Sequence, residues 1–204
     1  MSHKKTNFSQ KAEAYLQILQ TSFEPEIVKK IEQLANALLE AWVQRNNIFI
    51  CGNGGSAANA LHIANDFHYG IGACGAPPKL PGLRVEALPA NTGIITCLAN
   101  DTGYENIYSH QLEVKSRPGD LLIALSGSGN SPNIVNALKK AKNLSLKSFA
   151  ILAFSGGQSK DIADISIHFP VDDMQIAEDT QLIVGHLCMQ WLNTHKPSNL
   201  RHLG

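Results

Sequence analysis

The apolar residues of this chain follow two different spacing patterns along its length. From Glu24 to Gln44 they recur at spacings of three and four, which is typical of a helix with one buried face. Residues 8–21 repeat this pattern more weakly. Farther along, short runs such as 121–125 (LLIAL) and 149–154 (FAILAF) are apolar throughout and alternate with amphipathic stretches. Such runs are typical of parallel strands that helices cover on both faces.

This alternation predicts a doubly wound α/β domain with a mainly parallel, five-stranded sheet. We expect the strands at Asn47–Cys51, Arg84–Leu88, Asp120–Leu125, Ser148–Phe154 and Ile165–Phe169. We expect the helices at Ala57–Phe67, Thr92–Ala99 continuing through Tyr108, Ser131–Asn143, Gln158–Ala163 and about Gln175–Asn193. Residues 70–83 are rich in glycine and proline and are expected to be a loop long enough to serve as a flap.

The chain length of 204 residues suits one domain. We expect residues 46–194 to form that domain, with residues 195–204 as a C-terminal tail. Residues 1–45 should supply two N-terminal helices, and a small sheet cannot easily bury both of them. The two helices are therefore expected to serve oligomer packing against another subunit.

Composition excludes several classes of function. The formal net charge is zero, which argues against a nucleic-acid binder, and no apolar run is long enough for a membrane span. The N-terminus has no signal-peptide core. The cysteines are scattered, and Cys51 and Cys97 lie in apolar runs, so both are expected to be buried thiols rather than disulfides or zinc ligands. We expect a cytoplasmic protein.

Two loops rich in glycine and serine follow predicted strands. The first is residues 52–56 (GNGGS), and the second is residues 126–131 (SGSGNS), with Pro132 where the next helix should begin. Bare backbone N–H groups, serine hydroxyls and a helix N-terminus together favour a phosphate group. The alternative is a pair of tight turns capped by serine.

The first loop also satisfies G-x-G-x-x-A through Gly52, Gly54 and Ala57, a weak dinucleotide fingerprint. The acidic residue that should follow about 20 positions later is missing, because residues 70–83 fall there and Glu86 lies within a strand. The nucleotide P-loop GxxxxGK[ST] is absent. A dinucleotide role is therefore disfavoured.

His62 and Asp66 share one helix face at spacing i, i+4. This pair suits a divalent metal or a proton-transfer couple, and otherwise a surface ion pair or a hydrogen bond between helices. Glu178 and His186 lie eight residues apart on the last helix, about 12 Å along a regular helix, too far for one ion. Either that helix starts after Glu178, or the two residues act at sites shared between subunits.

Four segments together resemble the sugar isomerase (SIS) domain and, within it, the phosphoheptose isomerases. They are CGNGGSAANALHIANDF, LANDTGYENIYSHQ, GDLLIALSGSGNSPNIVNALKKAK and IAEDTQLIVGHLCMQWL. The resemblance covers essentially the whole chain. It implies a three-layer fold of flavodoxin or Rossmann type, a homotetramer with active sites between subunits, and one zinc ion per subunit. It also implies a phosphorylated sugar substrate, sedoheptulose 7-phosphate, while the charge and the apolar runs already exclude a nucleic-acid or membrane partner.

The resemblance carries roles onto particular residues. The family's substrate contacts match Asn53, Gly54 and Gly55, with Ser56 beside them, and also the pair Asn100 and Asp101. Its phosphate loop matches Ser126, Gly127, Ser128 and Ser131. A zinc ligand matches His62, and a zinc ligand or acid–base catalyst matches His186. The chain departs from the family at three positions. This chain has Asp66 where the family has glutamate, Glu178 where it has glutamine, and Gly127 where it has threonine.

The implied reaction is an aldose–ketose isomerisation through an enediol. We expect Asp66 and His186 to share the proton transfers. The expected metal ligands are His62 and Glu178, together with Asp66 and His186. Asp66 and Glu178 are also expected to contact the substrate. One alternative is a non-catalytic SIS tetramer that binds a replication-initiator protein. Others are an SIS isomerase of another phosphosugar, such as one used in surface-polysaccharide synthesis, and a sugar-phosphate-sensing regulator.

Overall fold

The computed structural model describes residues 7–74, 77–198 and 200. Its sheet contains five strands, all parallel, in the order β2-β1-β3-β4-β5. The strands are β1 (Asn47–Cys51), β2 (Arg84–Ala87), β3 (Leu121–Ser126), β4 (Lys147–Leu152) and β5 (Ile165–His168). The doubly wound α/β fold predicted from the apolar runs is thereby confirmed, with boundaries shifted by at most two residues.

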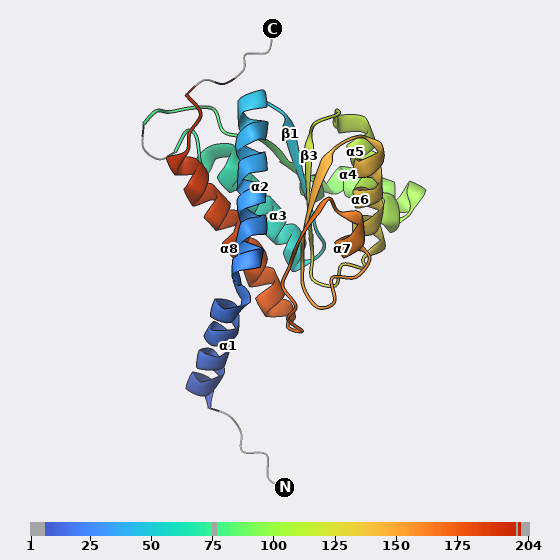
Figure 1. The fold of residues 1–204 in the computed structure, drawn as a ribbon. Helices are drawn as coiled ribbons and strands as arrows, with labels where there is room; N and C mark the ends of the chain where they lie inside the picture. Colours follow the sequence, from blue (N-terminus) through green and yellow to red (C-terminus); the bar gives the residue numbers. More distant parts are fainter. Residues whose placement is uncertain (1–6, 75–76, 199, 201–204) are drawn as a thin grey trace.

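Helices cover both faces of the sheet and give three layers (Figure 1). One layer contains α2 (Pro25–Gln44), α3 (Gly55–Asn65) and α8 (Met174–Thr194). The other contains α4 (Thr92–Thr102), α5 (Ser109–Lys115), α6 (Pro132–Asn143) and α7 (Ser159–Ile162). A π-helical turn, Asp66–Gly70, extends α3, and short 3-10 turns span Leu88–Ala90 and Tyr104–Asn106. The sequence pattern did not separate α5 from the helix before it.

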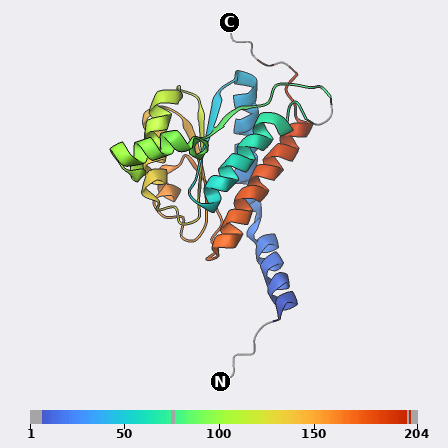
Figure 2. The same cartoon turned by 180° about the vertical axis from the view of Figure 1, so that it is seen from behind.

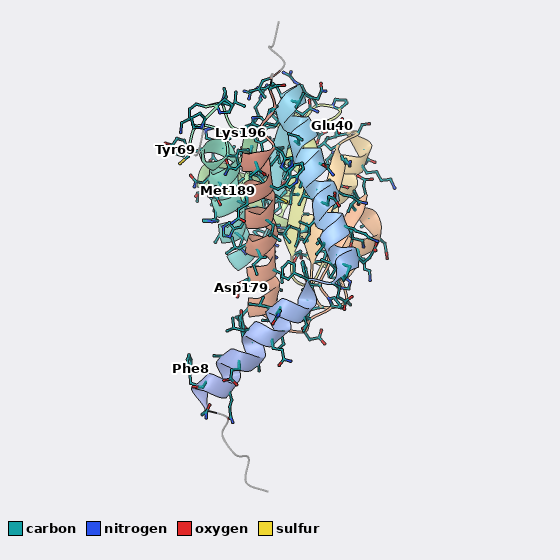
Figure 3. All side chains as sticks on the ribbon, turned by 60° about the vertical axis from the view of Figure 1, so that its left-hand side comes forward. Phe8, Glu40, Tyr69, Asp179, Met189 and Lys196 are labelled. Carbon is teal, nitrogen blue, oxygen red and sulfur yellow. The ribbon has the colours of Figure 1, made fainter. Side chains whose placement is uncertain are left out.

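The two N-terminal helices differ in their surroundings. α2 buries Leu38 and Trp42 in the core formed with β5, α3 and α8, and therefore belongs to this chain's own three-layer domain. α1 (Phe8–Ser22) projects away from the domain, and Phe8 near its tip is 87% exposed (Figure 3). Subunit packing by these helices stays a prediction, for which α1 is the more exposed of the two, and residues 1–6 lie outside the described residues.

α4 is an apolar helix that this chain covers only in part. None of its residues is buried, although its sequence TGIITCLANDT contains four large apolar side chains or thiols. Cys97 is consequently exposed, so the prediction of a buried thiol was wrong there, whereas Cys51 is buried as predicted. The apolar run identified the helix correctly, and Ile95, Leu98 and Ala99 pack against the core of the domain, but the side that carries Cys97 is left open. Among the described residues, no helix combines the length and the apolarity that crossing a membrane requires.

The strand order sets the position of a ligand site. β2 lies on one side of β1, whereas β3, β4 and β5 follow on the other, so the order in which strands join the sheet reverses between β1 and β3. Ligands of open α/β sheets bind beyond the carboxyl ends of the strands at such a switch point. The loops after β1 and β3 are the two loops rich in glycine and serine, and the fold therefore brings both to one place.

Candidate active site

A cavity of about 290 Å³ opens between the two loops. Its walls include the sequence-predicted residues Asn53, Gly54, Gly55, Ser56, Ser126, Gly127, Ser128, Ser131 and Glu178, together with Leu125 and Met174. Nine of the residues predicted to contact substrate or metal thus meet in one cavity, although they come from three separate stretches of the chain.

The first loop depends on glycine at two adjacent positions. Gly54 has φ 54° and ψ −122°, a conformation that side chains with a Cβ rarely adopt. At Gly55, a Cβ would collide with the carboxylate of Glu178. These glycines let the N-terminus of α3 approach α8 and leave its first backbone N–H groups facing the cavity.

A buried polar network joins α3 to α8 behind the cavity. The Gln181 side-chain amide, 1% exposed, donates to Ser56 Oγ at 3.0 Å, and Asn59 donates to Gln181 Oε1 and to the Glu178 carbonyl. Because Ser56 Oγ accepts from Gln181, its own proton stays available for a ligand in the cavity. Sequence analysis missed Asn59 and Gln181. Their signal is a spacing of three from Ser56 and Glu178, on the same helix faces.

The Asn53 side chain, which lines the cavity, is tied to the first turn of α6. Its side-chain amide exchanges two hydrogen bonds with Asn133, at 2.9 and 2.8 Å, and Asn133 is 1% exposed. The Tyr104 hydroxyl also donates to Asn53 Oδ1. The side chain of Asn53 therefore clamps the loops after β1 and β3 together. Asn133, which the sequence analysis missed, follows directly after the Ser131-Pro132 helix start.

The serines of the second loop have different roles, because one stabilises the loop and two keep hydroxyl protons available to a ligand. Ser126 is buried, and its Oγ accepts from the Gly129 N–H. Ser128 Oγ accepts from the Asn130 N–H, which leaves the Ser128 proton free, and no side-chain hydrogen bond of Ser131 occurs within the described chain. Two hydroxyls and the N-terminus of α6 can therefore donate to an anion in the cavity.

Gly127 has a neighbour that explains its lack of a side chain. A Cβ at this position would lie 2.9 Å from the Met174 sulfur and 3.5 Å from the Phe154 ring. Met174 thus fills the space that a threonine would use. The departure at position 127 is matched by an apolar side chain that lines the same cavity.

A second group of functional side chains lies farther along the two helices. α3 and α8 run side by side (Figure 2), and they bring together His62, Asp66 and His186. The Nε2 atoms of the two histidines are 3.0 Å apart, and Asp66 Oδ2 lies 3.4 Å from His62 Nε2 and 3.5 Å from His186 Nε2. The i, i+4 pair predicted from the sequence is therefore joined by a histidine from a distant part of the chain.

This arrangement fits a tetrahedral metal ion. Bonds of 2.0–2.2 Å in a tetrahedron place the ligand atoms about 3.3–3.6 Å apart, close to the three separations found here. Two imidazole nitrogens and one carboxylate oxygen are a donor set that zinc accepts, and three protein ligands leave one position for a substrate oxygen. Both histidine side chains are about half exposed, at 50% and 46%, so an ion and a ligand can reach them.

Glu178 and the Asn100-Asp101 pair are not part of this group in the described chain. α8 begins at Met174, so the idea that the helix starts after Glu178 was wrong, and Glu178 faces the cavity instead. Asn100 and Asp101 are hydrogen-bonded to each other on the exposed helix α4 and do not line the cavity.

Comparisons with known proteins agree on one family. The model of the SIS domain matches residues 12–153. The chain is 38% identical over 159 residues to the phosphoheptose isomerase of Akkermansia muciniphila, covering 77% of this chain and 80% of that protein, and 34% identical over 174 residues to that of Sulfurimonas denitrificans, covering 84% and 86%. The solved phosphoheptose isomerase of Neisseria gonorrhoeae has the same fold, with a TM-score of 0.82 at 24% identity over 91% of this chain and 96% of that one.

Proposed function

This chain belongs to the SIS-domain family and, within it, to the phosphoheptose isomerases, and from that premise we propose that it interconverts sedoheptulose 7-phosphate and glycero-manno-heptose 7-phosphate. It is then a sugar-phosphate isomerase that acts in heptose synthesis for lipopolysaccharide or capsule. The observation that carries the proposal is the pairing of an anion-binding cavity with the His62, Asp66 and His186 group on the same two helices.

The spacing of these two parts suits a seven-carbon substrate. His62 follows Gly55 by seven helical steps, which is about 10 Å at 1.5 Å per step. An extended seven-carbon chain with its phosphate spans about 10 Å, because each carbon–carbon bond of about 1.5 Å advances it by roughly 1.25 Å. A phosphate held by Ser128 and Ser131 therefore leaves the first two carbons near the histidines. Each carbon removed shortens this reach.

The reaction requires only proton transfers between neighbouring atoms. A base removes a proton from C1, the C2 carbonyl oxygen takes up a proton, and an enediol forms. Loss of the C1 hydroxyl proton and return of a proton to C2 then give the aldehyde, with no net change in composition. We assign these transfers to Asp66 and His186, whose Oδ2 and Nε2 atoms lie 3.5 Å apart. Each side chain has a second oxygen or ring nitrogen, so binding a zinc ion through one atom leaves the other for protons.

His62, Asp66 and His186 would hold the zinc ion, which when bound polarises the substrate carbonyl. The Glu178 carboxylate accepts hydrogen bonds from sugar hydroxyls, because it faces the cavity and would repel the phosphate itself. Within one chain, Glu178 lies apart from the histidine group, and Asn100 and Asp101 lie apart from the cavity. Metal binding by Glu178 and substrate binding by Asn100 and Asp101 would therefore require a second subunit. We propose a homotetramer in which the uncovered apolar sides of α1 and α4 form the contacts. The cytoplasmic location stays a prediction.

The proposal is tested by assaying the purified protein, loaded with zinc, against phosphosugars of different lengths. Sedoheptulose 7-phosphate should turn over, with fructose 6-phosphate at least tenfold slower and ribulose 5-phosphate slower still. The absence of turnover of the heptulose at any zinc loading would refute the assignment. Equal turnover of all three would refute the length argument and favour an isomerase of another phosphosugar.

A further inference from the structure

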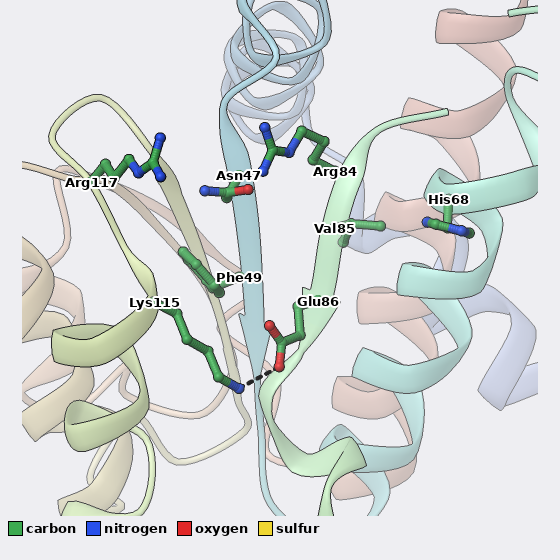
Figure 4. A pocket seen from close by; sticks show the side chains of 8 residues that line it. All are labelled: Asn47, Phe49, His68, Arg84, Val85, Glu86, Lys115 and Arg117. Atoms are coloured by element: carbon green, nitrogen blue, oxygen red, sulfur yellow. Dashed lines mark hydrogen bonds and ion pairs between the residues drawn. The ribbon is translucent and has the colours of Figure 1, made fainter. Parts of the chain in front are cut away.

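A second cavity, of about 370 Å³, lies at the opposite edge of the sheet. Its lining includes Asn47 and Arg84 at the amino ends of β1 and β2, together with Lys115 at the end of α5 and Arg117 just after it (Figure 4). Its volume falls in the range of small-molecule sites. The cavity exists because α5 ends at Lys115 and leaves the start of β1 and of the edge strand β2 without a covering helix on that face.

The strand register gathers the polar side chains on one face. Arg84 pairs with Asn47, and Glu86 pairs with Phe49, so the alternation of β2 turns Arg84 and Glu86 to the same side and Val85 to the other. Figure 4 shows the guanidinium groups of Arg84 and Arg117 on either side of Asn47. The sequence analysis assigned no role to any of these cations.

Carboxylates lie near the two arginines, but in the described chain none of them forms an ion pair with either guanidinium. Glu86 is paired with Lys115 at 2.5 Å. Asp120 lies beneath, but its oxygens already accept from the Asn47 backbone and side chain and from the Arg117 backbone N–H. Within the described part of the chain, neither the Arg84 nor the Arg117 guanidinium has a hydrogen-bond or ion-pair partner. Two like charges beside each other disfavour the folded state unless an anion joins them.

We propose that this cavity binds the phosphate group of a phosphorylated, hydroxylated small molecule. Two guanidinium groups can donate paired hydrogen bonds to phosphate oxygens, the geometry for which arginine is best suited. The side-chain oxygens of Glu86 and Asn47, beside them, can accept from hydroxyl groups of the same ligand. The site is separate from the proposed active site, because it lies at the amino ends of the strands and the active-site cavity lies at the carboxyl ends.

Calorimetric titration of the intact protein with pyrophosphate at 0.15 M salt tests the proposal. The active-site loop is first blocked by Ser128→Asp, whose carboxylate repels the probe. This protein should still bind about one pyrophosphate per chain. Adding Arg84→Gln and Arg117→Gln should weaken that binding at least tenfold, whereas Lys139→Gln with Lys142→Gln, the same charge change on the exposed side of α6, should leave it unchanged.

Binding that survives the arginine substitutions, or falls equally in the lysine control, would overturn the site. A change of oligomeric mass in the arginine variant, measured by light scattering, would mean that this face is a subunit contact and would also overturn it. Sedoheptulose 7-phosphate binding no tighter than inorganic phosphate would remove the hydroxyl contacts from the proposal. Isomerase turnover is measured separately on the arginine variant, so failure of this site is distinguishable from failure of the proposed function.

Discussion

The cavity and the histidine group, though both lie along α3 and α8, are held in place by different means. Around the cavity, Ser56, Asn53 and Ser126 are each fixed by a hydrogen bond to a buried partner. The histidines are half exposed, and His62 and His186 contact chiefly each other and Asp66. The difference indicates that the binding half is preorganised by the fold. The reacting half keeps its side chains open to a metal ion and to protons.

Removing His186 should have the largest effect and should act on the reacting half alone. His186→Ala is expected to lower kcat by about 10²–10⁴-fold, the usual contribution of a proton-transferring group, with little change in the free energy of unfolding because the side chain is half exposed. Steady-state kinetics and urea unfolding measure the two quantities. His110→Ala, on α5, is the matched control. A kcat within threefold of the parent protein would contradict the assigned role.

Removing Asn133 should affect the binding half instead. Asn133→Ala removes a buried amide and leaves the half-buried amide of Asn53 without that partner, and we expect a loss of about 1–3 kcal/mol in unfolding free energy. The KM should rise as the two loops loosen. Asn136→Ala, in the same helix but with a hydrogen bond at the surface, should cost less than half as much. Equal losses in both variants would show that the Asn53–Asn133 clamp has no special role.

The free energy of unfolding should also fall at alkaline pH. Burial raises the pKa of the Cys51 thiol, at the end of β1, to about 12, so the folded state keeps a proton that the unfolded chain releases near pH 9. Stability is therefore intact below pH 9 and is lost as the pH rises toward 12, by about 1.4 kcal/mol one unit above the unfolded pKa. Urea midpoints at pH 7 and pH 10 test this. Cys51→Ala should reduce the difference, whereas Cys74→Ala, at an exposed thiol, should not.

A smaller effect is expected at the contact between the first loop and α8. Gly55→Ala places a methyl group where the Glu178 carboxylate lies, and the flexible glutamate should swing away. We expect KM to rise about three- to tenfold with kcat nearly unchanged. The rise in KM could come from the added methyl group or from the displaced Glu178 carboxylate, and the double variant Gly55→Ala with Glu178→Ala separates the two. If the methyl group itself blocks the site, the double variant will have a higher KM than the Glu178→Ala protein and will be no more stable.

Much of the site could be predicted because it depends on local features. The loops at 52–56 and 126–131 stand out as bare backbone between an apolar strand and a helix, and His62 and Asp66 share a face through helical periodicity alone. Asn59, Gln181 and Asn133 could not be assigned in the same way. Each is an ordinary polar residue on a helix, and its role comes from a partner more than 75 residues away in the sequence for Asn133 and more than 115 for Asn59 and Gln181.

The sequence by itself determined the order of strands and helices, the parallel sheet and the chemical character of the two loops, because these follow from periodicity and from the properties of glycine and serine. Tertiary structure alone decided which side chains meet. It joined His186 to His62 and Asp66, turned Glu178 toward the cavity and left Cys97 on the exposed side of α4. It also gathered Arg84 and Arg117 at the far edge of the sheet. The physical reason is that burial and proximity depend on how helices pack, which a one-dimensional pattern does not contain.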